Sequence, residues 1–343
     1  MMKMKKLFLW IFAVALLLSG CASPSQIPVP QPSTASTQPP PKATAFQPVS
    51  VTKTPAQPTT TIPPSATPRI LAERVLIISV DGLRADSVNQ FDMPNTYALM
   101  QNGAYALDAY TTYPSATLPS HASMLTGMCP NKNGVDWNDY LPENGYAASP
   151  AIFEIAHNAG LRTVMVVGKE KLIQLTPPEN IDSFDFVNDR DSVVAERAIE
   201  RIAEGFDLIF VHLPLVDGLG HTYGWMSPNY ITGTYRADEA IGVLLTALDE
   251  AGIRQGTLIL VTSDHGGHDT THGSRLREDM QVPWILTGAS INSGAIPRKV
   301  STVDTAATIA YALNLPIPEI WDGVPVYEAF GDAASPRVER PCE

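Results

Sequence analysis

Three things are scarce in this sequence of 343 residues: basic side chains, cysteines and apolar runs of membrane-spanning length. Lysine and arginine total 23 against 35 acidic residues, and the formal net charge of −12 argues against a nucleic-acid-binding surface. The apolar run Leu7–Leu18 falls short of the roughly 20 residues that cross a bilayer. No internal repeat is visible, and no second linker interrupts the chain after residue 68, so we expect one large folded domain.

Residues 1–20 have the pattern of an export signal, in which three lysines precede the apolar run Leu7–Leu18. The segment Leu18-Ser19-Gly20-Cys21 then resembles the lipobox of bacterial lipoproteins. That resemblance implies a lipid on Cys21 and a membrane-anchored, extracytoplasmic protein of the bacterial cell envelope. An ordinary secretion signal and a short membrane anchor are the alternatives.

Residues 21–68 are rich in Pro, Ser, Thr, Gln and Ala and have hardly a large apolar side chain. Such a segment cannot offset its ordering entropy by burial, so we expect an extended tether. The folded domain is expected at residues 69–330 and a C-terminal tail at residues 331–343. Cys129 and Cys342 are left as a pair once Cys21 is assigned to lipid, and both a disulfide and two free thiols stay open.

Apolar strand candidates alternate with helical patterns along the folded domain. The predicted strands are Val75–Val80, Thr163–Val167, Leu208–Leu213, Thr257–Val261 and Pro283–Leu286. The predicted helices are Met93–Asn102, Leu118–Thr126, Ala151–Ala159, Val193–Ala203, Tyr230–Ala251 and Asp304–Leu313. Nearly uniform apolar strands alternating with amphipathic helices predict an α/β fold with a mostly parallel central sheet covered by helices on both faces.

Three of the predicted strands are each followed by an aspartate. Asp81 follows the first strand, Asp217 the third and Asp264 the fourth, and histidines lie close to the last two. Each aspartate alone could merely cap a turn. Three at the same sheet edge favour one polyanionic site, which requires a cation. The histidines concerned are His221, His265, His268 and His272.

Thr117 lies where the helix pattern Leu118–Thr126 begins, with Pro119 in the first turn, where proline is tolerated. In one interpretation its hydroxyl simply caps the helix. In the other, a metal activates the hydroxyl as a nucleophile and the helix N-terminal amides hold an anion in front of it.

Taken together, these motifs resemble the alkaline phosphatase superfamily, and most closely its type I phosphodiesterase/nucleotide pyrophosphatase branch. The resemblance covers essentially the whole folded domain and implies the three-layer sandwich of that superfamily. The motifs concerned are Ser79-Val80-Asp81-Gly82, Thr117-Leu118-Pro119-Ser120-His121, Asp217-Gly218-Leu219-Gly220-His221, Ser263-Asp264-His265-Gly266, Thr271-His272-Gly273 and Val303-Asp304-Thr305-Ala306-Ala307-Thr308-Ile309.

The resemblance implies a catalytic centre with two zinc ions, and manganese is compatible with the same ligand types. Thr117 would be the nucleophile and form a phosphothreonine intermediate. One zinc would be held by Asp217, His221 and His272, and the other by Asp81, Thr117, Asp264 and His265.

Ser120 departs from the family pattern, because nucleotide pyrophosphatases usually place an asparagine there that donates to a phosphoryl oxygen. We assign Ser120 to substrate binding, although its shorter side chain implies that the oxygens are held differently. Sulfatase chemistry is rejected because Thr117 cannot be oxidised to formylglycine.

Several other residues have two interpretations. Trp137, Asn138 and Tyr140 lie where the resemblance implies substrate contacts, although aromatics more often cover the core. Lys169 and Lys171 could meet phosphate, but a solvated face is expected. His268 could support the site or contact substrate but is expected in a solvated loop, and His212 is expected in the core.

The sequence therefore predicts a lipid-anchored, extracytoplasmic, dizinc phosphodiesterase that hydrolyses a small phosphoester. A phosphomonoesterase or phosphonate hydrolase of the same fold and a phosphoryl-group transferase are the enzyme alternatives. The alternative without catalysis is a surface binding protein on an inactive scaffold, which the complete set of ligand positions disfavours.

Overall fold

The computed structural model describes residues 71–333 and 342, which fall within one compact unit that spans residues 64–343. The predicted signal peptide, the lipid site at Cys21 and the tether lie outside the described residues, as does most of the C-terminal tail. Among the described residues, no helix is long and apolar enough to cross a membrane.

A mixed eight-stranded sheet forms the centre of the described chain, in the order β4-β3-β5-β1-β6-β7-β2-β8. The central strands β3, β5, β1 and β6 are parallel, whereas β7 runs antiparallel to both β6 and β2. The strands are β1 (Arg74–Val80), β2 (Ala104–Tyr110), β3 (Thr163–Val167), β4 (Ser183–Phe186), β5 (Leu208–Leu213), β6 (Thr257–Thr262), β7 (Gln281–Thr287) and β8 (Gly294–Ala295).

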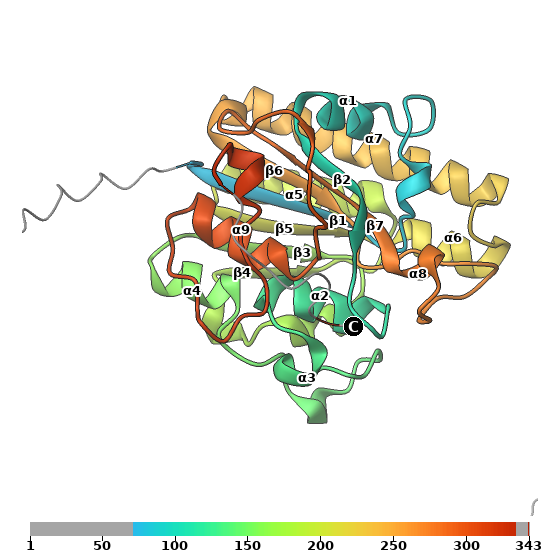
Figure 1. The fold of residues 1–343 in the computed structure, drawn as a ribbon, viewed down its shortest axis with the longest axis horizontal. Coiled ribbons are helices and arrows are strands. Elements are labelled where there is room, and N and C mark those ends of the chain that lie inside the picture. The colour runs from blue at the N-terminus through green and yellow to red at the C-terminus, as the bar shows by residue number, and fades with distance from the viewer. Residues whose placement is uncertain (1–70, 334–341, 343) are drawn as a thin grey trace, which may run out of the picture. The chain divides into compact units, whose positions relative to one another are not determined.

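Helices cover both faces of this sheet (Figure 1). They are α1 (Pro94–Asn102), α2 (Thr117–Thr126), α3 (Pro130–Asn133), α4 (Ile152–Asn158), α5 (Asp191–Glu204), α6 (Leu215–Tyr223), α7 (Pro228–Glu250), α8 (Arg277–Met280) and α9 (Asp304–Ala312). Short 3-10 helices lie at Ala85–Ser87, Pro142–Asn144, Glu170–Leu175, Pro178–Asn180, Arg254–Gly256 and Tyr327–Phe330. The predicted α/β class with a mostly parallel, helix-covered sheet is confirmed.

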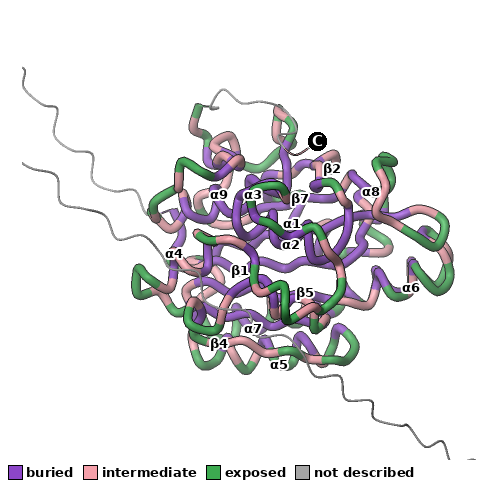
Figure 2. Tube along the Cα trace, turned by 90° about the horizontal axis from the view of Figure 1, so that it is seen from below, coloured by how far each residue is buried: buried purple, intermediate pink, exposed green. Residues whose placement is uncertain are grey.

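Each face of the sheet has its own apolar core, and β1 shows why. Val75 and Ile77 pack with α2, α4 and α9, whereas Leu76, Ile78 and Val80 pack with α1, α5 and α7. Both faces of a central parallel strand are buried, so its sequence reads as a continuous apolar run rather than an alternating one. Figure 2 shows this burial along the central strands, with exposed residues confined to the periphery.

Three strands (β2, β4 and β8) and three helices (α3, α6 and α8) are absent from the sequence prediction. Strand β2 was not predicted, because its sequence AYALDAY contains Asp108 and lacks the branched residues that mark the other strands. Helix α6 was not predicted either, because Gly218 and Gly220 give its sequence a low intrinsic helix propensity.

A disulfide joins Cys129, which precedes α3, to Cys342 in the C-terminal tail. The sequence left this pairing open against two free thiols. The bond ties residue 342 to the face of the sheet that carries α2, α3 and α4.

Candidate active site

Three aspartates converge at the carboxyl ends of the central strands. Asp81 follows β1 directly, Asp264 lies two residues after β6, and Asp217 lies in the first turn of α6, which follows β5. Because β1 pairs with β5 on one side and β6 on the other, these strand ends are neighbours. Gly82 has a positive φ of 71°, and a Cβ at this position would lie 3.0 Å from the Cα of Asp217. The close approach of the two aspartate-bearing segments therefore requires glycine at position 82.

Each of these buried carboxylates engages one oxygen and leaves the other without a hydrogen-bond partner among the described residues. The Oδ2 of Asp81 accepts from His212 at 2.8 Å, and the Oδ1 of Asp264 accepts from the amide of Gly82 at 3.1 Å. The buried atoms left over are Asp81 Oδ1, Asp217 Oδ1, Asp264 Oδ2 and His265 Nε2. Unpaired buried groups of this kind are costly, so their convergence indicates a cation site.

The spacing of the unpaired atoms fits metal coordination better than hydrogen bonding. His265 Nε2 lies 3.4 Å from Asp81 Oδ1 and 3.3 Å from Asp264 Oδ2. A tetrahedral zinc site with bonds of about 2.0–2.1 Å separates its ligand atoms by about 3.4 Å. The Asp81, Asp264 and His265 group is called the inner ligand group below.

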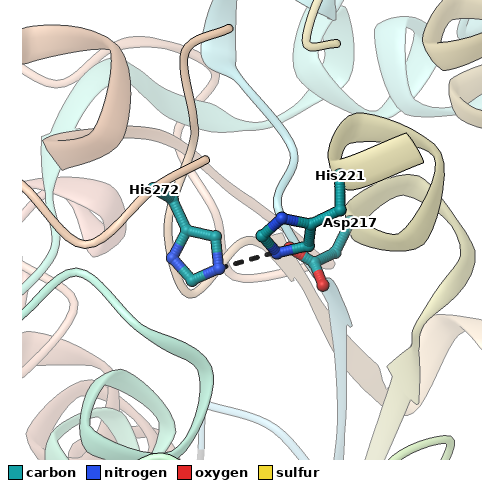
Figure 3. Close-up of side chains that lie close together, drawn as sticks. All are labelled: Asp217, His221 and His272. Carbon is teal, nitrogen blue, oxygen red and sulfur yellow. Dashed lines mark ion pairs between the residues drawn. The ribbon is translucent and has the colours of Figure 1, made fainter. Parts of the chain in front are cut away.

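A second group of ligands adjoins the first through Asp217. Its Oδ1 lies 3.4 Å from His221 Nε2 and 3.6 Å from His272 Nε2. Figure 3 draws these three side chains close together. His221 and Asp217 occupy the same face of α6 because they are four residues apart. The same Oδ1 is 3.9 Å from His265 Nε2, so the two groups are contiguous. We call Asp217, His221 and His272 the outer ligand group.

The three histidines of these groups share one tautomer. Each Nδ1 lies within 3.0 Å of a backbone carbonyl oxygen, which can only accept, so Nδ1 carries the proton and Nε2 presents its lone pair. This is the arrangement by which proteins orient metal-binding imidazoles. The pairs are His265 with Gly266, His221 with Thr270, and His272 with Ser115.

Lys169 lies inside the site, so the expectation that it belongs to a solvated face is wrong. Its Nζ is 2.7 Å from Asp81 Oδ2, 2.6 Å from Asp217 Oδ2 and 3.3 Å from Thr117 Oγ1. Burial disfavours the ammonium form, but the nearby carboxylates outweigh that effect and raise the pKa of Lys169 above its ordinary value. A lysine two residues after a strand gives no sign in the sequence that its side chain turns inward.

Thr117 is the first residue of α2, and the N-cap position belongs to Ala116 without a side-chain cap. The capping interpretation of Thr117 is therefore wrong. The next amide, of Leu118, donates to Asn138 Oδ1 at 2.9 Å, so it is already engaged by the protein. Asn138 thus completes the start of the helix that carries Thr117.

His121 fixes the same helix turn from within. Its Nδ1 lies 2.8 Å from the carbonyl oxygen of Thr117, and its Nε2 accepts from the hydroxyl of Ser79 at 2.8 Å. Complete burial lowers the pKa of His121 to about 4, so the imidazole is neutral near pH 7. The hydrogen bond between Ser79 and His121 joins β1 to α2, one helical turn after Thr117.

The remaining sequence candidates fall outside the two ligand groups. The hydroxyl of Ser120 is buried and has no hydrogen-bond partner among the described residues. His212 is buried as predicted, but it also orients Asp81. His268 Nδ1 lies 2.7 Å from Asp279, and Trp137 packs against the core.

A cavity of about 330 Å³ opens beside Lys169. Tyr140 and Phe186 supply exposed aromatic surface to it, and Lys171 lines it as well. Its other lining residues are Asp139, Gly168, Lys169, Glu170 and Asn188. The cavity therefore places a mixed aromatic and charged surface beside Lys169.

Comparison with known families gives a match over most of the chain. The model of the family described as type I phosphodiesterase/nucleotide pyrophosphatase matches residues 75–308. This range contains every residue of the two ligand groups as well as Thr117, Ser120 and Lys169.

Similar proteins include the catalytic subunit of human GPI ethanolamine phosphate transferase 2, at 29% identity over 76% of this chain and 28% of that protein. Mouse ectonucleotide pyrophosphatase/phosphodiesterase family member 3 is 27% identical over 57% of this chain and 25% of that protein. The chain thus spans about a quarter of the length of these two curated relatives. Among solved structures, an inactive threonine-to-alanine variant of murine ectonucleotide pyrophosphatase/phosphodiesterase 5 in complex with AMP superposes with a TM-score of 0.63. That match has 16% identity and covers 72% of this chain and 96% of that chain.

Proposed function

The chain belongs to the type I phosphodiesterase/nucleotide pyrophosphatase family, and we propose that it is a metal-dependent phosphodiesterase that hydrolyses a small phosphoester through Thr117. The observation that carries this proposal is the convergence of unpaired carboxylate oxygens and an unpaired imidazole nitrogen beside the Thr117 hydroxyl. Leaving these buried atoms unpaired costs free energy unless a cation binds among them.

The ligand types favour two zinc ions, with manganese compatible. The inner ligand group together with Thr117 would hold one ion and the outer ligand group the other. Two such ions, when bound, withdraw charge from the attacking and leaving oxygens of an in-line displacement.

The chain's own residues then have separate roles. Thr117 Oγ1 attacks phosphorus, the leaving oxygen departs, and a phosphothreonine remains until water attacks the same phosphorus. His121 and Asn138 hold the turn that presents Thr117. The cavity with Tyr140 and Phe186 is the place for the organic group of the substrate, since it adjoins Lys169 and is partly apolar.

Hydrolysis of two chromogenic esters tests this function. The purified protein should cleave bis-p-nitrophenyl phosphate faster than p-nitrophenyl phosphate and lose that activity to a chelator. Thr117→Ala should lower kcat at least about 10³-fold, since no other hydroxyl replaces the nucleophile. Thr232→Ala is the control, because Thr232 is exposed on α7 and bonds only the carbonyl of Pro228 among the described contacts. A much faster monoester reaction would identify a phosphomonoesterase instead.

A phosphoryl-group transferase is the second candidate, favoured by the similarity to a protein named GPI ethanolamine phosphate transferase 2. In a transferase, an alcohol rather than water would accept the group from Thr117. Adding glycerol or ethanolamine as acceptor to the bis-p-nitrophenyl phosphate reaction should then divert product from p-nitrophenyl phosphate to a mixed diester of the added alcohol. A product ratio independent of acceptor concentration supports the hydrolase.

Location at a membrane is part of the proposal and rests on the motif around Cys21. Cells fed an alkyne fatty acid should incorporate the label into the wild-type chain but not into Cys21→Ala. Equal labelling of both chains would place the lipid elsewhere.

A further inference from the structure

Lys169 contacts residues from three elements that meet at the reacting centre. Its ammonium reaches Asp81 after β1, Asp217 on α6 and Thr117 at the start of α2. The side chain is 21% exposed, and its neighbours Asp81 and Asp217 are buried. The cation is therefore enclosed at the centre of the site while one side of the residue faces the adjoining cavity.

The lysine and the unpaired ligand atoms use different oxygens. Lys169 takes Oδ2 of Asp81 and Oδ2 of Asp217, whereas Oδ1 of each aspartate is left for the ligand groups. The ammonium therefore does not compete with a bound cation for the same oxygen. Lys169 and metal ions can occupy the site together.

The position of Lys169 is set by its preceding residue. The amide of Gly168 donates to His212 Nδ1 at 3.2 Å, and His212 Nε2 in turn donates to Asp81 Oδ2. A Cβ at position 168 would lie 2.4 Å from the ring of Pro214, so only glycine allows this approach. Lys169 is thus presented by a tightly packed segment rather than by a loose loop.

The ammonium of Lys169 also lies within reach of the Thr117 hydroxyl. A lysine ammonium has three donors. One bonds Asp217 Oδ2 at 2.6 Å, and Asp81 Oδ2 lies 2.7 Å away in an ion pair. Thr117 Oγ1, at 3.3 Å, is at the far end of hydrogen-bonding distance. A phosphoryl group attached to that oxygen would bring its non-bridging oxygens toward the same ammonium.

Ser120 lies on α2, three residues after Thr117. In this chain the Ser120 hydroxyl is buried and bonds no other described group.

We propose that Lys169 is a catalytic residue that donates a hydrogen bond to a non-bridging oxygen of the phosphoryl group transferred to Thr117. This role rests on the proposed function and adds a charged donor to it. An ionic donor suits the negative charge of the phosphoryl oxygens and makes a stronger hydrogen bond than an amide.

Steady-state kinetics with saturating metal test the role. Lys169→Met keeps the length of the side chain without its charge, and should lower kcat about 10²-fold or more for bis-p-nitrophenyl phosphate. Lys132→Met is the matched control, because it removes an exposed lysine that pairs with Asp322 at 2.6 Å away from the site. Its kcat should stay within about twofold of wild type. Metal content and melting temperature are measured for all three proteins.

Binding of inorganic phosphate provides a readout that does not need turnover. Titration calorimetry compares Thr117→Ala with Thr117→Ala/Lys169→Met, each loaded with metal. The double variant should bind phosphate at least tenfold more weakly at the same metal content. If Lys169→Met does not fold, the shorter polar variant Lys169→Gln replaces it in both assays.

Two results overturn the role of Lys169. One is a kcat within threefold of wild type together with unchanged phosphate affinity. The other is full recovery of Lys169→Met in excess metal, which would make Lys169 only a partner of the carboxylates. If wild type cleaves no ester at all, the proposed function fails, whereas the phosphate titration still judges Lys169 independently.

Discussion

The two ligand groups differ in how far the protein encloses them. The inner group of Asp81, Asp264 and His265 has fully buried side chains. In the outer group, the side chain of His221 is 44% exposed and that of His272 is 10% exposed. The inner group is built on the ends of central strands, whereas His221 lies in the last turn of α6 and His272 lies in a loop.

This difference implies that a cation in the inner group would be enclosed by the folded protein. A cation in the outer group would be open to exchange with solvent. The carboxylates of Asp81, Asp217 and Asp264 favour a positive charge in the inner group: burial alone would lower the pKa of His265, but these carboxylates outweigh that effect and raise it. In the outer group, water reaches His221 and screens the same charges. We therefore expect tight, structural binding in the inner group and weaker binding in the outer group.

The largest effect is expected from His265→Ala in the inner group. The substitution leaves buried carboxylates without their imidazole, so activity should fall by far more than the roughly 10–100-fold typical of residues that only support a ligand. Added metal should not restore it. Metal analysis of the purified variant, with kcat measured across a zinc titration, checks this, and recovery at high zinc would contradict the buried character of the group.

A smaller effect is expected from His221→Ala in the outer group. Because His221 is exposed and Asp217 and His272 remain, metal affinity should fall by at least the roughly 10–100-fold typical of residues that only support a ligand, while the fold stays intact. Excess zinc should restore most of the activity. Thr222→Ala, the exposed neighbour on α6, serves as the control. A variant that fails to recover would show that the two groups do not differ as described.

Chelation of the wild-type protein should separate the groups without mutation. A chelator should remove the outer ion first and abolish activity, with little change in melting temperature. The second ion should leave more slowly and lower the melting temperature when it does, since bound ligands stabilise the folded state. Metal content, activity and melting temperature followed over one time course measure this, and simultaneous loss of both ions would count against it.

The smallest effect concerns Asp191, whose Oδ1 accepts from the amide of Leu215 at the start of α6. Burial raises the pKa of Asp191 from 3.8 to about 7. The folded state thus keeps a proton that the unfolded state releases, so stability is lost as the pH rises from about 4 to about 7. Asp191→Asn cannot ionise and should gain roughly 2 kcal/mol relative to wild type between pH 5 and pH 8.

Denaturant unfolding at the two pH values measures that gain for Asp191→Asn. Asp189→Asn, close by before α5, is the control, and its difference from wild type should be the same at both pH values. If the difference in unfolding free energy between Asp191→Asn and wild type is also the same at both pH values, the buried carboxyl of wild type is ionised at both. The amide at the start of α6, which carries Asp217 and His221, is thus bonded by the buried Asp191 side chain, whose pKa is raised to about 7.

The central sheet could be predicted because burial on both faces leaves a direct mark on a strand. Val75–Val80, Leu208–Leu213 and Thr257–Val261 each contain a single polar residue and are otherwise apolar, and each is a central strand. The antiparallel strand β7 carries the same mark, whereas β2 does not. Helix α6 was hidden for another reason, since its stability comes from packing against α7 rather than from helix-forming residues.

The candidate site was predictable where residue type alone implies chemistry. Aspartates after buried strands, and a histidine four residues after one of them, indicate ligands before any coordinates are known. Lys169 was not predictable, because a lysine is usually solvated and only the folded chain brings Asp81 and Asp217 to it. The role of His212 in orienting Asp81 was missed because a histidine inside an apolar strand suggests packing alone.

In Asp81 and in Asp217, the two carboxylate oxygens face different partners. This restricts which residues can replace either aspartate. One oxygen of each meets an ammonium, and the other faces the ligand groups. An asparagine at either position must turn its amide hydrogens toward the ammonium or toward a bound cation, both of which are positive. A glutamate is one methylene longer, so its carboxylate would overshoot both partners. These two positions should therefore tolerate no substitution in a saturation-mutagenesis screen, whereas the positions that supply only one contact should accept several.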